Sequence, residues 1–280
     1  GASAIRFQDT DVALGRVYYY RVTAFDGAAF ANESFYSDSQ PADSAWANRG
    51  NFYVNDASTT GDSFTYGAGS DASAGEGTRQ RPFASLAKAM QYVTAGDTIW
   101  LDAGTYGGDT WEMISATETA AVNLDTDNLA LIGKDSGATV IDPAGAKTLS
   151  GLYGIYAANR VGLLIKNLGV TGAYEGVQWS NVDLSTISGD SICSNGDYGI
   201  YFTTNSDSNT VSGNTLGFNS FEGFYINSGT NNTLSNNSAN SNSGNGFSFV
   251  ACSGNSLTSN TAKSNVYGIA FLIKKNKIDV

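Results

Sequence analysis

Histidine is absent from this chain of 280 residues. Its absence excludes catalytic triads and general bases built on histidine, and the zinc sites that most often use it. Cysteine is scarce, with Cys193 and Cys252 alone. These two residues occupy different phases of the repeat described below, and we therefore expect two free thiols rather than a disulfide.

Charge is also limited, at 15% of the residues, and acidic side chains predominate to give a net charge of −11. Such a surface disfavours nucleic acid and anionic membranes as partners, but it permits divalent cations. The sequence has no apolar run near the roughly 18 residues of a membrane-spanning helix, and no recognisable signal peptide. Its richness in Ser, Thr, Asn and Gly predicts an extracellular or cell-surface protein without membrane insertion.

A glycine recurs about every 23 residues through the second half of the chain. The residues one and three positions after each glycine are apolar, which is the alternation of a strand with one buried face. One short strand cannot bury its own face, so successive repeats must stack. The glycines are Gly154, Gly176, Gly199, Gly223, Gly246 and Gly268. The side chains predicted to point inward are Ile200, Phe202, Phe224, Ile226, Phe247 and Phe249.

Two further apolar points follow in each repeat. The second is Ile187, Val211, Leu234 and Leu257, and the third is Ile192, Leu216, Ala239 and Ala262. Three short strands in about 23 residues leave no room for a helix and describe one rung of a parallel β-helix. Leucine-rich repeats have a similar period, but their Leu-x-x-Leu-x-Leu pattern is missing.

Asparagine marks the corners between these strands. Asn tolerates the left-handed backbone that a corner needs, and amides stacked one rung apart can hydrogen-bond along the column. Composition alone would also allow a disordered Asn/Ser tract, but three rows in register argue against one. The predicted ladder is Asn167, Asp190, Asn214, Asn237 and Asn260. The other rows are Asn195, Asn219, Asn242 and Asn265, and Asn209, Asn232 and Asn255.

The first 46 residues are a different kind of sequence. Their strands, Gly15-Arg16-Val17-Tyr18-Tyr19-Tyr20-Arg21-Val22-Thr23-Ala24 and Asn32-Glu33-Ser34-Phe35-Tyr36-Ser37-Asp38, resemble the end of a fibronectin type III domain. Half of such a domain would leave strand edges exposed, and exposed edges pair with other chains. The segment therefore predicts either a truncated domain or a contact with other copies of the protein.

The part that follows resembles the N-terminal end of known β-helices. A strand at 51–56, a helix at 83–94 with Pro82 before it, and a strand and turn at 97–106 look like the cap of right-handed parallel β-helices in bacterial surface proteins and polysaccharide lyases. Less regular rungs are expected at 107–150, with strands at 128–132 and 139–141. The later rungs are similar to pectate-lyase-like and NosD-type repeats.

These features predict an all-β fold. The expected architecture is a right-handed, single-stranded parallel β-helix solenoid with an N-terminal capping helix, plus a short antiparallel β segment at the N-terminus. The expected divisions are a fibronectin-like segment at 1–46, a cap and loop region at 47–96, and β-helix rungs at 97–280.

Candidate functional residues lie on the outward side of the rungs. Tyr156, Tyr201 and Tyr225 stand two positions after their glycines, where rings serve either as a sugar platform or as ordinary cross-strand pairs. Asp183 and Asp207 are one repeat apart and could share calcium. Carboxylates also precede the glycines, at Glu175 and Glu222 with Asp197 near them, and others lie in the cap loop at Asp56, Asp62 and Asp71.

The signatures of β-helix enzymes are missing from the sequence. Neither Gly-His-Gly, Asp-Pro-His nor Arg-x-Pro-x-x-Arg occurs, and Arg160 and Lys166 are the only basic residues between positions 148 and 262. The sequence therefore favours a structural, adhesive or polysaccharide-binding module whose partner is a polysaccharide or another copy of itself. The alternative is a calcium-dependent lyase acting on an acidic polysaccharide, with Arg160 or Lys166 as its base. No cofactor other than calcium is indicated.

Overall fold

The computed structural model describes residues 50–72, 77–107, 112–144, 148 and 150–272. The chain divides into two compact units, Gly1–Gly50 and Asn51–Val280, and the second unit is described here. The expected fibronectin-like strands and their self-association therefore lie outside the described residues.

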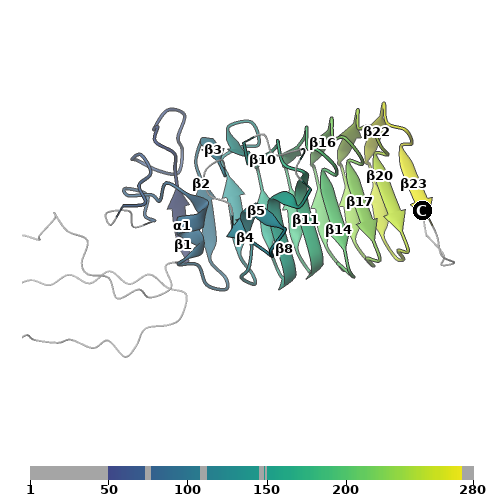
Figure 1. The fold of residues 1–280 in the computed structure, drawn as a ribbon, viewed down its shortest axis with the longest axis horizontal. Helices are drawn as coiled ribbons and strands as arrows, with labels where there is room; N and C mark the ends of the chain where they lie inside the picture. Colours follow the sequence, from purple (N-terminus) through teal and green to yellow (C-terminus); the bar gives the residue numbers. More distant parts are fainter. Residues whose placement is uncertain (1–49, 73–76, 108–111, 145–147, 149, 273–280) are drawn as a thin grey trace, which may run out of the picture. The chain divides into compact units, whose positions relative to one another are not determined.

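Three sheets of stacked strands build the second unit (Figure 1). The first sheet contains β1 (Asn51–Val54), β2 (Thr98–Leu101), β6 (Ala130–Gly133), β9 (Leu164–Lys166), β12 (Thr186–Ser188), β15 (Thr210–Ser212), β18 (Thr233–Ser235) and β21 (Ser256–Thr258). The second contains β3 (Gly104–Tyr106), β7 (Thr139–Ile141), β10 (Gly169–Val170), β13 (Ser191–Ile192), β16 (Thr215–Gly217), β19 (Ser238–Asn240) and β22 (Thr261–Lys263). The third contains β4 (Glu112–Met113), β5 (Thr119–Asn123), β8 (Leu152–Val161), β11 (Glu175–Asp183), β14 (Ile200–Thr203), β17 (Phe224–Asn227), β20 (Phe247–Val250) and β23 (Ile269–Leu272).

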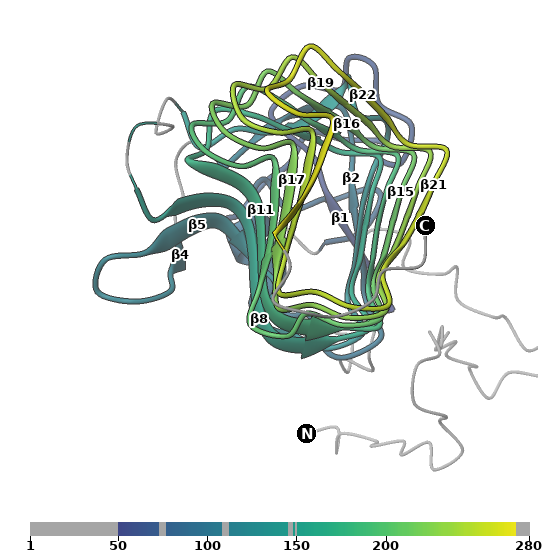
Figure 2. The ribbon, with the colours of Figure 1, turned by 90° about the vertical axis from the view of Figure 1, so that its right-hand side faces the viewer.

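The chain visits the three sheets in turn, so each circuit is one rung. Strands of neighbouring rungs pair in parallel, and in the described part of the chain the one antiparallel pair of strands is β4 with β5. Figure 2 looks along the stack and shows the three sheets as three sides of each rung, with β4 and β5 projecting beside β11. This arrangement confirms the expected parallel β-helix.

The core is a stack of apolar side chains that point inward from all three sheets. Ile200, Phe202, Phe224 and Ile226 are 0% exposed, as the alternation after each glycine predicts. Phe247 and Phe249 are buried as well. Aromatic rings also pack from rung to rung, with Trp179 stacked on Phe202 at 4.9 Å between ring centroids.

The repeating glycine is required by the closeness of successive rungs. A Cβ built on Gly199 would lie 2.5 Å from the carbonyl oxygen of Gly223 and 2.8 Å from Nδ2 of Asn219. The same clash recurs for Gly154 and Gly176, each against the carbonyl of the glycine one rung later. Only a residue without a side chain fits between the core and the next rung at this corner.

Buried polar side chains form three columns at the corners of the rungs. In the central column Asn214 donates from its backbone nitrogen and from Nδ2 to Oδ1 of Asn237, at 3.0 Å each. Its Nδ2 also donates to the carbonyl of Ile187 at 3.0 Å. The corner columns comprise Ser185, Asn209, Asn232 and Asn255; Asp190, Asn214, Asn237 and Asn260; and Asn195, Asn219, Asn242 and Asn265.

The sequence placed Asn167 in the central column, and the structure corrects this. Leu168 occupies the corresponding place, where its backbone nitrogen donates to Oδ1 of Asp190 at 2.7 Å. Asn167 is the residue before it and has a φ of 57°, which is the left-handed corner conformation. Gly189 and Gly213 hold the same position in the next two rungs, with φ of 71° and 66°. Asn167 therefore turns the corner instead of joining the amide column.

The helix predicted at 83–94 is shorter in the structure, where α1 spans Leu86–Met90. Phe83 is held by a bridge to Val54, so it cannot join the helix. Ser85 caps the helix, since its side chain accepts a hydrogen bond from the backbone nitrogen of Lys88 at 3.1 Å. The first sheet also starts before the expected boundary at residue 97, because β1 already pairs with β2.

Replacing Asn237 with Leu is expected to destabilise the protein by about 1–3 kcal/mol. Leu would leave the buried carbonyl of Val211 and the amides of Asn214 and Asn260 without the bonds that Asn237 makes with them. Urea unfolding followed by circular dichroism measures the change. Thr233→Leu is the control, because this exposed side chain lies on the same rung. Equal stabilities for the two variants would contradict the role of the buried amide.

Asp190 is expected to make stability dependent on pH. Burial raises its pKa from 3.8 to about 7. Its Oδ2 has no partner, whereas on the next rung Nδ2 of Asn214 donates to the carbonyl of Ile187. The folded chain thus keeps a proton that the unfolded chain has already released, and stability falls as pH rises from about 4 to about 7. With about 1.4 kcal/mol for each pKa unit, the loss is on the order of 2–4 kcal/mol.

The substitution Asp190→Asn removes this dependence and supplies the missing amide donor. We expect the variant to be more stable than the wild type at pH 8, with a smaller difference at pH 4. Urea unfolding at both pH values measures it, and the exposed Asp125→Asn serves as control. A variant that is less stable than the wild type at pH 8 would refute the interpretation.

Candidate functional site

Two columns of outward side chains run side by side across the third sheet. The tyrosine column contains Tyr156, Gln178, Tyr201, Tyr225 and Ser248 on successive rungs. The glutamate column contains Tyr153, Glu175, Tyr198, Glu222 and Asn245, and each member stands three residues before its neighbour in the tyrosine column. Strand alternation aims the tyrosine column away from the core, and the parallel register brings its members into line. The glutamate column shares this side, because the ring of Tyr153 contacts that of Tyr156 and the ring of Tyr198 contacts that of Tyr201.

The structure brings together two of the three predicted tyrosines. Tyr201 and Tyr225 lie on adjacent rungs, with their ring centroids 5.2 Å apart. Tyr156 is separated from Tyr201 by the rung of Gln178 and stacks instead on Tyr153, at 5.2 Å. The predicted trio is therefore a pair and an outlier in the same column.

Tyr198 and Phe221 complete an aromatic cluster with this pair. The ring of Tyr198 lies 5.0 Å from those of Tyr201 and Tyr225, and it is nearly parallel to the latter, at 13°. Phe221 meets Tyr198 edge-on at 5.5 Å and is 50% exposed. The aromatic cluster, as we call Tyr198, Tyr201, Phe221 and Tyr225, is thus partly open to a ligand.

Buried oxygens without hydrogen-bond partners accompany the rings. Glu175 and Glu222 are each 7% exposed, and Oε2 of each has no partner in the structure. The other oxygen of Glu222 accepts from Nδ2 of Asn245 and Oγ of Ser248, at 3.2 Å each. Oε1 of Gln178 is also buried without a partner. Most buried polar atoms in proteins are bonded, so three oxygens without partners on one face call for an explanation.

Carboxyl groups on this face perturb one another. Burial, together with Asp197 and Glu118, raises the pKa of Glu175 to about 8, and its side chain therefore carries a proton at neutral pH. Burial also raises the pKa of Glu222. Asp197 accepts a hydrogen bond from Tyr174, and Glu118 accepts one from the hydroxyl of Tyr153 at 2.8 Å. The face is consequently acidic and rich in acceptors.

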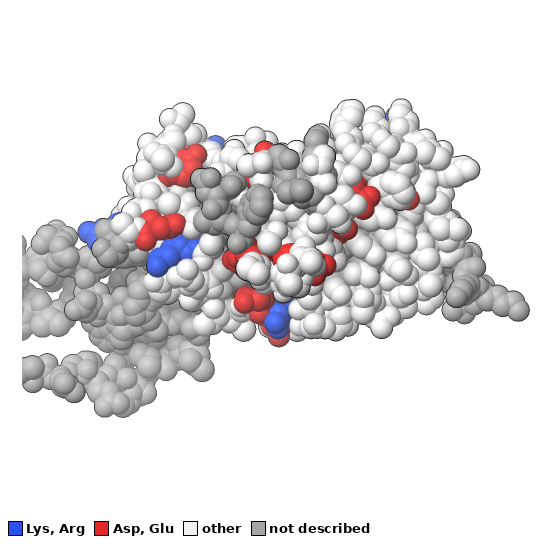
Figure 3. Space-filling model, in the orientation of Figure 1, with Lys and Arg blue, Asp and Glu red and all other residues white. Residues whose placement is uncertain are grey.

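The basic residues that the lyase alternative needs lie elsewhere. Arg160 is beyond the tyrosines near the end of β8, where its Nη1 is 3.7 Å from Oδ1 of Asp127. Lys166 lies at the end of β9 in the first sheet. Neither belongs to the two columns. Figure 3 views the face of the third sheet and shows more carboxylate than basic atoms on it.

The structure does place Asp183 and Asp207 one rung apart, but their carboxylates are engaged with the backbone. Oδ1 of Asp183 accepts from the nitrogen of Asp207 at 2.8 Å, and Oδ1 of Asp207 accepts from that of Thr230 at 2.5 Å. In residues 50–272, apart from the undescribed gaps, no group of three His, Cys, Asp or Glu side chains is placed to hold a metal ion. The calcium site on these two residues thus stays a prediction.

The cap loop also uses its carboxylates for structure. Oδ1 of Asp56 accepts from the nitrogen of Ser58, and Oδ1 of Asp71 accepts from that of Ala84. Asp62 accepts from Nδ2 of Asn55 at 2.7 Å. Asp102, which sequence reasoning did not single out, binds the backbone nitrogens of residues 63–65. These bonds fix the loop against β1 and β2.

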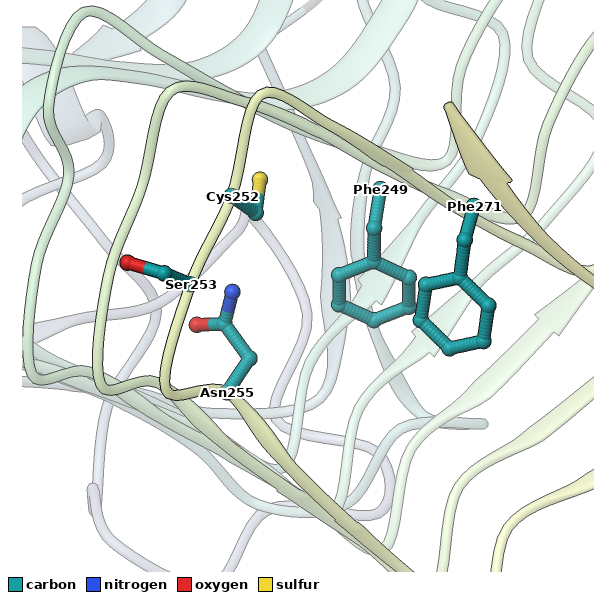
Figure 4. Close-up of a pocket in the computed structure, with 5 residues that line it drawn as sticks. All are labelled: Phe249, Cys252, Ser253, Asn255 and Phe271. Atoms are coloured by element: carbon teal, nitrogen blue, oxygen red, sulfur yellow. The ribbon is translucent and has the colours of Figure 1, made fainter. Parts of the chain in front are cut away.

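A small hollow opens at the far end of the stack (Figure 4). The rings of Phe249 and Phe271 lie side by side on one wall, and Cys252, Ser253 and Asn255 form the other. Both cysteines are free, as expected, and burial raises the pKa of the Cys252 thiol. The hollow is the end of the core rather than part of the two columns.

Several residues of the face were missed from the sequence. Tyr153 precedes Gly154 as Glu175 precedes Gly176, and Gln178 follows Gly176 as Tyr201 follows Gly199. Both could have been found by extending each column through every repeat. Phe221 carries no periodic signal, because it lies in a turn between β16 and β17.

Solved structures of other proteins share this architecture. Two solved structures share the fold at 18% identity and a TM-score of 0.52: the periplasmic alginate epimerase AlgG, with 74% of this chain and 47% of that one covered, and the pectate lyase Pel9A, with 72% and 52%. This chain thus spans about half the length of each. A search of curated protein sequences finds no match. Among the described residues no helix is long and apolar enough to cross a membrane.

The model of a family described as the right-handed β-helix region matches residues 134–280, which is more than half of the chain. The match covers the regular rungs with their glycine and asparagine columns. It also agrees with the handedness expected from the sequence. The chain belongs to the right-handed β-helix family.

Proposed function

We propose that this protein binds a polysaccharide along the outward face of its third sheet. The observation that carries the proposal is the aromatic cluster, with Tyr198 and Tyr225 stacked at 5.0 Å and Phe221 half exposed beside them. The apolar face of a sugar ring packs on aromatic rings in the same way as another flat apolar surface does. A stiff sheet holds the rings in place before the ligand arrives, which reduces the entropy lost on binding.

The arrangement of the two columns suits a long ligand. A rung of tyrosines, Tyr153 and Tyr156, is followed by the polar rung of Glu175 and Gln178, and then by Tyr198 and Tyr201. Tyrosine pairs two rungs apart are separated by roughly 10 Å, twice the strand spacing. Rings and polar groups thus both recur along the stack, so several sugars of an extended chain could each meet a ring and a hydrogen-bonding group.

The fold neighbours accord with this proposal. Alginate epimerase and pectate lyase are named for polysaccharides, and they share the stacked architecture with this chain. The function proposed here is binding, in a structural or adhesive module outside the cytoplasm, because the basic residues Arg160 and Lys166 stand apart from the two columns. A catalytic lyase would need one of them beside the ligand.

Replacing Tyr201 or Tyr225 with Ala is expected to weaken polysaccharide binding by roughly 2- to 10-fold each. This range corresponds to the 0.5–1.5 kcal/mol that an aromatic contact contributes. The double variant should lose more than either single one. Affinity electrophoresis against a panel of neutral, acidic and amine-bearing polysaccharides, followed by calorimetry on the polymer that is bound, measures the effect.

Tyr66→Ala is the matched control, since this tyrosine is 70% exposed and lies in the cap loop, outside the third sheet and both columns. Binding should be unchanged in this variant. The proposal fails if no polymer of the panel retards the wild-type protein, or if the control loses as much affinity as Tyr201→Ala.

A further inference from the structure

The polar lining of the two columns has a marked imbalance of charge, because it includes carboxyl groups and no cation. No Lys or Arg belongs to either column. Glu118, Glu175, Asp197 and Glu222 all lie near enough to raise the pKa of a neighbouring carboxyl or tyrosine. Glu175 keeps a proton and relieves part of the repulsion, while the remaining carboxylates oppose one another.

The free oxygens point to what relieves this repulsion. Glu175 and Glu222 are more than nine-tenths buried on the outward face, and each keeps an oxygen without a partner. Gln178 adds a third free acceptor on the rung of Glu175. Elsewhere on the rungs, the corner columns satisfy such groups with amides of the next rung. A ligand that brings N–H or O–H donors would satisfy the oxygens of Glu222 and Gln178 in the same manner, and an acceptor on it would meet the proton of Glu175.

We infer that this face selects a polysaccharide whose sugars carry protonated amines. The inference rests on the proposed function and specifies its ligand. An ammonium group supplies three donors and a positive charge, and it forms charge-assisted hydrogen bonds with Glu222 and Asp197. A uronate carboxylate would meet the same two carboxyl groups with no cation to pair with it, which places its repulsion in a partly buried site.

The tyrosine rings and the carboxyl groups contribute differently to ligand binding. Tyr198, Tyr201 and Tyr225 contact the faces of the sugars, and this contact is indifferent to charge. Glu222 and Asp197 border the same rings and read the substituent at the edge of the sugar. Selectivity therefore depends on the acidic residues, whereas affinity for any glycan depends on the tyrosines.

Calorimetry of the full chain with three oligosaccharides of equal length tests the inference. The probes are oligomers of glucosamine, of N-acetylglucosamine and of galacturonate at pH 6. The first should bind at least about tenfold more tightly than the second, and the third should be the weakest. Added salt should weaken binding of the glucosamine oligomer, because partly exposed charges are screened.

The double variant Asp197→Asn and Glu222→Gln keeps the shapes of the side chains and removes their charges. It should bring the affinities for the glucosamine and N-acetylglucosamine oligomers to within about threefold of each other. Asp125→Asn, an exposed substitution outside the two columns, should leave the tenfold preference intact. A thermal melt of each variant verifies that it is folded.

The outcomes separate this inference from the proposed function. Equal affinity for the acetylated and the amine oligomer, or tighter binding of the galacturonate oligomer, overturns the charge selectivity, while a loss of binding in Tyr201→Ala would still support the platform. A preference that survives in the double variant also overturns it. If none of the three oligomers nor any polymer of the panel binds, the proposed function itself is wrong.

Discussion

Registration of each rung on the next is the constraint on which the rest of this structure depends. Parallel backbone pairing sets the distance between rungs, and three corner columns repeat the same distance with side chains. Each amide in the central column both accepts and donates along the stack, as Asn214 does with Asn237. A slip by one residue would break all three columns at once and would turn buried side chains such as Phe224 outward. The columns therefore exclude alternative registers that the backbone alone would tolerate.

The same register creates the functional face. Because every rung begins at equivalent positions, residues one repeat apart in sequence become neighbours about one strand spacing apart in space. Tyr201 and Tyr225 meet for this reason, and so do Glu175 and its tyrosine neighbours. A binding site on such a solenoid needs no loop to assemble it. It needs only that the outward position of several successive repeats carry the right side chain.

Much of this could be predicted from the sequence, because a period is visible without coordinates. The alternation after each glycine identified Ile200 and Phe202 as core residues, and both are buried. The wrong placement of Asn167 shows the limit of aligning repeats by their length. The repeat length varies by a residue, so either Asn167 or Leu168 could be aligned with Asp190. The backbone decides between them, because the corner residue is left-handed and the column residue follows it. Sequence does not display that difference when both positions tolerate Asn.

Buried carboxyl oxygens without hydrogen-bond partners occur at two kinds of place, inside an amide column and on the outward face of the third sheet. Asp190, Glu175 and Glu222 each retain an oxygen without a partner. Asp190 lies inside an amide column, where protein atoms surround it and where Asn214 on the next rung shows what would satisfy the site. Its substitution by Asn should therefore remove a defect. Glu175 and Glu222 lie on the outward face beside tyrosine rings, where no repeat supplies the missing donor. In the described part of the chain no side chain donates to these two oxygens. The unsatisfied oxygen is therefore a defect in the column at Asp190, whereas at Glu175 and Glu222 it supports the proposed ligand.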